Sequence, residues 1–150
     1  MQSSLVLVQF ASQNIALLCC ALFAGAALYV SLVEQPAIAA GGAQATGAYV
    51  LLAQPRPMFF HTFFASVGAL AGITAGVTGG VILWLAGGLV LTFATMFQLA
   101  VVLPETRRLF KADLIADPEK ATDVLTRLTK LHAVQSITGL VALSMFILKA

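Results

Sequence analysis

The sequence predicts an all-α integral membrane protein, an antiparallel four-transmembrane-helix bundle with a charged helical extension between helices 3 and 4. Of 150 residues, 60% are hydrophobic and 9% are charged, and the mean hydropathy is +0.98. Soluble domains carry roughly 25% charged residues, so this chain has too few charges to cover a water-facing surface. The composition excludes a cytosolic globular enzyme, a disordered tail and a nucleic-acid binder, which needs a dense basic patch. The length corresponds to a single domain, residues 1–150.

Four stretches are apolar enough to supply the roughly 20 residues of a spanning helix. The first covers residues 10–33 and is expected to end at Glu34-Gln35-Pro36. Its start lacks the basic residues of a signal peptide, so we expect a retained helix. The second covers 57–76, with proline at a position that tolerates it. The third covers 81–103, after a glycine-rich turn, and the fourth covers 131–148.

The positions of the charges predict the orientation. Seven of the eight Lys and Arg residues fall in the segments 34–56 and 104–130, which four spans place on one side of the membrane. Lys149 is the exception. Positively charged loops remain in the cytoplasm or its organellar equivalent. We therefore expect a bacterial inner membrane protein, or its organellar counterpart, with both termini on the outer side.

The segment 105–130 carries most of the charge and has helical signals. Asp117 is a good N-cap, Pro118 suits the first helical position, and Glu119 lies in the first turn. We expect the fourth helix to begin near Pro118 and to project from the membrane. The third helix is expected to continue past Pro104 in the same way.

Small residues predict where helices approach closely. Gly68, Gly72 and Gly76 recur at four-residue spacing on one helix face, which permits close packing in lipid. This face serves packing within the chain, or association with a second copy or a larger membrane complex. Adjacent Cys19 and Cys20 cannot form a normal disulfide, so we interpret them as small buried hydrophobic residues rather than redox groups.

Four ionisable residues are expected at the inner end of the bundle: Glu34, His61, Glu105 and His132. Two carboxylates and two imidazoles could hold a metal, as comparable sets do in di-iron bundles. The Glu-x-x-His spacing of those proteins is absent, so interfacial solvation or helix capping is the favoured role for each. A further alternative makes His61 or His132 the axial ligand of a haem or chlorophyll. No motif implies a cofactor.

Other polar and aromatic residues lie near the same level. A buried amide needs a partner, so Gln98 and Gln135 are expected to bond across helices. Trp84 is expected in an interfacial aromatic belt. Four phenylalanines beside His61 either wall an aromatic-ligand pocket or face lipid; they are Phe59, Phe60, Phe63 and Phe64.

Three motifs resemble the anthrone-oxygenase-like family, small four-helix membrane proteins catalogued mostly as a domain of unknown function. Residues 22–37, LFAGAALYVSLVEQPA, resemble the family's opening signature. Residues 103–109, LPETRRL, fall where members read Pro-Thr-Asn or Pro-Ile-Asn before a basic stretch. Residues 128–136, LTKLHAVQS, fall where members often show Trp-x-x-Leu-His-x-x-Arg. The chain has Glu105 and Thr106 in place of that Asn stretch, Gln135 in place of Arg and Leu128 in place of Trp.

The resemblance implies oxidation of a phenolic or quinol-type aromatic substrate at the inner membrane interface, because some members convert anthrones to anthraquinones. His132 would then be the general base, since the unperturbed pKa of histidine is about 6.5. Glu34 would orient or stabilise it, and Phe60, Phe64 and Gln135 would contact the substrate. The alternative is a non-catalytic accessory or structural subunit of a larger membrane protein complex.

Overall fold

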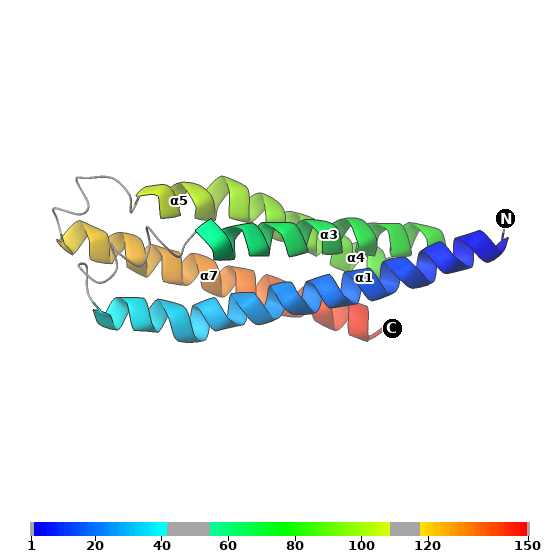
Figure 1. Ribbon diagram of the computed structural model, residues 1–150, viewed down its shortest axis with the longest axis horizontal. Coiled ribbons are helices and arrows are strands. Elements are labelled where there is room, and N and C mark those ends of the chain that lie inside the picture. The colour runs from blue at the N-terminus through cyan, green and yellow to red at the C-terminus, as the bar shows by residue number, and fades with distance from the viewer. Residues whose placement is uncertain (1, 42–54, 109–117, 150) are drawn as a thin grey trace.

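The computed structural model describes residues 2–41, 55–108 and 118–149, and every element in these ranges is helical (Figure 1). The elements are α1 (Gln2–Tyr29), η1 (Val30–Glu34), α3 (Pro55–Gly79), α4 (Ile82–Phe97), η2 (Gln98–Val102), α5 (Leu103–Arg108) and α7 (Pro118–Ile147). Four of the continuous helices within these residues are long and apolar enough to cross a membrane: Ser3–Gly41, Met58–Gly79, Ile82–Arg108 and Thr122–Ile147. The prediction of four helices that are long and apolar enough to span a membrane is therefore confirmed.

Two helices continue through a proline. The first continues past Pro36 to Gly41, so the predicted end at Glu34-Gln35-Pro36 is wrong. The third continues past Pro104 to Arg108, and the fourth begins at Pro118, both as predicted. The rest of the predicted extension, including Asp117, lies outside the described residues.

The long helices pack side by side in pairs. Helix α1 contacts α3 and α7, and α4 contacts the same two helices. Both chain ends lie toward the same end of the molecule (Figure 1). Every spanning helix therefore has neighbours against which it buries one side.

The glycines of α3 make close helix contacts possible. A Cβ added at Gly76 would lie 2.5 Å from the backbone nitrogen of Leu85, and one at Gly72 would lie 3.1 Å from the Cα of Gly88. Gly68 likewise faces Leu91 of α4. These glycines pack within the chain, which is the favoured sequence interpretation. They are therefore covered by the chain's own helices and do not form an exposed face for a second copy.

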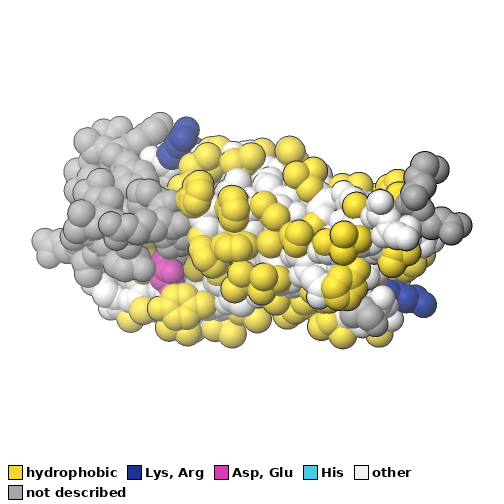
Figure 2. Space-filling model, turned by 45° about the vertical axis from the view of Figure 1, so that its right-hand side comes forward, with side chains coloured by type: hydrophobic (Ala, Val, Ile, Leu, Met, Phe, Trp, Pro, Cys, Tyr) yellow, Lys and Arg dark blue, Asp and Glu magenta, His cyan; other side chains and the backbone are white. Residues whose placement is uncertain are grey.

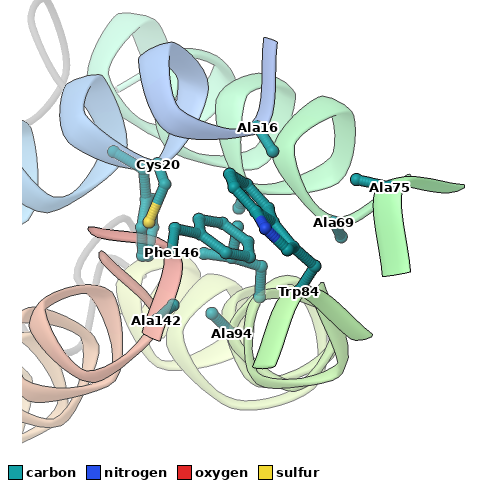
Figure 3. Close-up of a cluster of buried hydrophobic side chains, with 11 residues drawn as sticks. Ala16, Cys20, Ala69, Ala75, Trp84, Ala94, Ala142 and Phe146 are labelled. Atoms are coloured by element: carbon teal, nitrogen blue, oxygen red, sulfur yellow. The ribbon is translucent and has the colours of Figure 1, made fainter. Parts of the chain in front are cut away.

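A buried aromatic pair occupies the centre of the apolar core (Figure 3). The rings of Trp84 and Phe146 are stacked with centroids 4.9 Å apart, and alanines from all four long helices surround them. Trp84 is fully buried, so its predicted place in an interfacial belt is wrong. Its ring N–H donates to the backbone carbonyl of Lys149 at 3.3 Å, so the indole finds its partner inside the protein rather than at the membrane surface. Cys19 and Cys20 are buried and free, as predicted.

The outer surface is rich in large apolar side chains. Figure 2 shows hydrophobic side chains across the middle of the visible face, with charged side chains toward its ends. More than half of the Leu70, Ile82 and Ile137 side chains is exposed. Because lipid tails are as apolar as these side chains, such a surface suits contact with a bilayer.

Candidate functional site

A small polar cavity lies where all four long helices meet. It is lined by Val30, Glu34, Met58, His61, Gln98, Val102, Thr106 and His132. Its volume is about 10 Å³, close to the smallest space that admits one water molecule. The predicted residues Glu34, His61 and His132 therefore line the same cavity.

Two π-helical turns supply half of the cavity lining. They are Val30–Glu34 and Gln98–Val102, and the first and last residue of each turn lines the cavity. A proline follows each turn at the same distance, two residues after its end: Pro36 after the first and Pro104 after the second. Such wide turns are rare in helices and occur frequently at functional sites.

The prolines explain why the helices widen at this level. A proline in a regular helix lacks an N–H and its ring collides with the carbonyl group four residues earlier. A wider turn immediately before the proline moves that carbonyl and lets the helix continue. The N–H groups of Gln35 and Leu103 accordingly donate to the carbonyls of Val30 and Gln98, five residues earlier. The two turns were not predicted from the sequence, although the two prolines were their signal.

A chain of hydrogen bonds holds His132. Its Nδ1 lies 3.1 Å from the side-chain oxygen Oε1 of Gln135. The amide Nε2 of Gln135 in turn donates to the side-chain oxygen Oε1 of Gln98 on η2. The predicted bond between the two amides is therefore confirmed. All three residues are buried, so these hydrogen bonds fix the orientation of the His132 imidazole.

His61 is the second imidazole at the cavity. Only 2% of the residue is exposed, and its ring packs edge-on against Phe23 with centroids 5.9 Å apart. The ring forms a hydrogen bond with the backbone of Ala26. Its Nε2 atom is buried and has no hydrogen-bond partner among the described residues.

Side-chain bonds also fix the first π turn to α7. The hydroxyl oxygens of Ser31 and Ser136 lie 2.7 Å apart. One turn further along, the hydroxyl of Thr129 donates to the side-chain oxygen of Gln35 at 3.4 Å. These bonds hold Glu34, which lies between Ser31 and Gln35 in the sequence, close to the helix that carries His132.

Glu105 does not line the cavity. Its carboxylate lies 3.0 Å from Arg108 and 3.6 Å from Arg127 of α7. Among the described residues, no three His, Cys, Asp or Glu side chains lie close enough to hold a metal ion. The four-residue metal set considered from the sequence is therefore not brought together: Glu105 pairs with arginines, and the three described residues that line the cavity do not group closely enough to hold an ion.

The predicted aromatic wall also lies elsewhere. Phe60 and Phe64 pack against each other with ring centroids 4.4 Å apart, and neither lines the cavity. Phe60 is exposed on the outer surface, which fits the lipid-facing alternative. Gln135 forms a hydrogen bond with Nδ1 of His132 but does not itself line the cavity, whereas Met58 and Thr106 do. Neither Met58 nor Thr106 was predicted from the sequence.

The fold and the site together define a helical membrane protein with a buried polar centre. No family model, curated protein or solved structure matches the chain.

Proposed function

We propose that the chain is an antiparallel four-helix bundle that oxidises a phenolic or quinol-type aromatic substrate at the inner interface of its membrane. The bundle has both termini on the outer side of a bacterial inner membrane or its organellar equivalent. The observation that carries the proposal is the buried His132, which is anchored by two amides and faces a polar cavity. The resemblance to anthrone-oxygenase-like proteins supports the substrate class.

The bonding of His132 makes it a proton acceptor. The side-chain oxygen of Gln135 only accepts hydrogen bonds, so Nδ1 of His132 donates and carries the ring proton. Gln135 itself does not line the cavity, so the lone pair of Nε2 is the one available there. His132 is therefore the general base that takes the proton of a phenolic hydroxyl.

The cavity size decides which part of the substrate enters. A volume of about 10 Å³ is far too small for an aromatic ring, so only hydroxyl groups of the substrate enter the cavity. The ring must remain beside the cavity, against apolar lining residues such as Val30 and Met58, and a hydroxyl group of the substrate reaches His132. Buried polar surroundings of this kind strengthen a hydrogen bond to the hydroxyl.

Dioxygen is the electron acceptor of the proposed oxidation. A quinol loses two protons and two electrons to become a quinone, and dioxygen takes both electrons and both protons to become hydrogen peroxide. His132 receives the first proton and passes it on as peroxide forms. Removing that proton makes the ring electron-rich, so electron transfer to dioxygen becomes easier.

The test uses the full chain in lipid nanodiscs with catechol and, separately, with hydroquinone, in buffer that contains a metal chelator. Oxygen consumption and hydrogen peroxide are measured together. His132→Gln keeps a hydrogen-bond donor but loses the base, so the rate should fall at least about 100-fold. Ser144→Ala lies on the same helix, at an exposed position where the hydroxyl donates to the carbonyl of Leu140, and should keep the wild-type rate.

Two results would overturn the proposal. One is a wild-type rate equal to that of empty nanodiscs, which favours the accessory-subunit alternative. The other is an unchanged rate in His132→Gln. Retention of the folded state in the variant is checked by its melting temperature.

A further inference from the structure

The unpartnered nitrogen of His61 identifies a second binding group in the cavity. A buried polar atom without a hydrogen bond is rare in folded proteins and calls for an explanation. Nε2 of His61 is such an atom, and only 2% of the residue is exposed. The residue lines the same cavity as His132.

The Ala26 hydrogen bond determines which nitrogen carries the proton. Because Nε2 has no partner, the nitrogen bonded to Ala26 is Nδ1. The N–H of a residue inside a helix is already bonded within that helix, so the group of Ala26 that takes part is its carbonyl. Nδ1 of His61 therefore donates, and Nε2 presents a lone pair, as Nε2 of His132 does.

Two imidazole lone pairs consequently share one small space. The rings come from different helices, α3 and α7, and both residues line the cavity. The cavity has a volume of only about 10 Å³, so small polar groups can enter it but an aromatic ring cannot. A ligand that satisfies both lone pairs must carry two hydrogen-bond donors close together.

We infer that the site takes an aromatic ligand with two adjacent hydroxyl groups, as in catechol, and that His61 binds the second hydroxyl. This deepens the proposed function, on which it rests for the role of His132. Hydroxyls on opposite sides of a ring are too far apart to enter the same small space. His61 is thus a substrate-binding residue that selects adjacent over single or opposed hydroxyls.

The same arrangement accounts for both protons of the oxidation. One O–H bond breaks toward Nε2 of His132 and the other toward Nε2 of His61. The two electrons pass to dioxygen, which leaves as hydrogen peroxide with the two protons. The catechol becomes an ortho-quinone, and both imidazoles return to their starting state.

The experiment measures binding without turnover. Catechol and 2-methoxyphenol, in which one hydroxyl is methylated, are titrated into nanodiscs without oxygen and followed calorimetrically. Wild type should bind catechol at least about fivefold more tightly, the value of one neutral hydrogen bond. His61→Phe should abolish this preference, and His61→Gln, which keeps an acceptor oxygen, should retain part of it. Thr74→Ala, at an exposed position of α3, is the control.

Equal binding of both probes to wild type would overturn the inference, as would an undiminished preference in His61→Phe. If His61→Phe does not fold, His61→Gln is used instead. A reduced preference for catechol in that variant supports the inference, and an undiminished preference overturns it. A His61-dependent preference without any hydroquinone or catechol turnover would sustain the binding site and refute only the proposed function.

Discussion

Gly76→Ala should destabilise the protein because the added methyl group has no room. Its Cβ would lie 2.5 Å from the backbone nitrogen of Leu85 and 2.8 Å from the Leu85 Cα. Backbone atoms cannot move aside as a flexible side chain can, so α3 and α4 must separate. Overpacking of this kind costs about 1–3 kcal/mol, whereas replacing a helical glycine by alanine gains about 0.8–1 kcal/mol. We expect a net loss of up to about 2 kcal/mol.

Gly25→Ala is the matched control. Gly25 also lies inside a helix, and a Cβ there meets nothing within 4 Å. This variant should gain the full propensity term of about 0.8–1 kcal/mol. The difference between the two variants isolates the steric cost, about 1–3 kcal/mol.

The assay is reversible unfolding of both variants in mixed micelles with increasing denaturing detergent. The two free energies of unfolding are compared with that of the wild type. Equal effects of the two substitutions would refute the packing of α3 against α4.

Three further predictions concern the core and the site. Phe146→Ala should lower the free energy of unfolding by about 3–5 kcal/mol, because the fully buried ring stacks on Trp84. The same unfolding assay measures this loss. A loss of free energy no larger than that of a surface substitution would contradict the prediction. Gln135→Leu should cost about 1–3 kcal/mol by leaving the side chain of Gln98 unpaired. The double variant with Gln98→Leu should cost less than the sum of the two single variants, and strict additivity would argue against the bond. Pro104→Ala should raise the free energy of unfolding by up to about 3 kcal/mol. It should also weaken catechol binding, since it removes the cause of the second π turn. Unchanged catechol binding, measured by calorimetry, would show that the turn does not shape the site.

The sequence was sufficient to predict the spans because apolar runs in lipid have few alternatives. It also predicted the Gln98–Gln135 bond, since two buried amides at one level must satisfy each other. Helix continuity through Pro36 was missed because the usual rule ends a helix before proline. That rule does not consider a π turn, which accommodates the ring without breaking the helix.

The site was predicted only in part for a related reason. Topology places Glu34, His61 and His132 at one level, and these three do line the cavity. Side-chain direction around a helix depends on its register, and each π turn shifts that register. The sequence therefore did not distinguish Glu105, which pairs with arginines, from Glu34. Nor did it reveal that Phe60 faces outward.

The most direct test of the account is the proton position on its two imidazoles. The chain has only two histidines, so nitrogen NMR of histidine-labelled protein in lipid gives two pairs of ring signals, one Nδ1 and one Nε2 for each residue, which His61→Gln assigns. We predict that both rings carry their proton on Nδ1 and that both Nε2 signals shift when catechol is added. A proton on Nε2 of either ring, or Nε2 signals that catechol leaves unchanged, would contradict a site built on two imidazole acceptors.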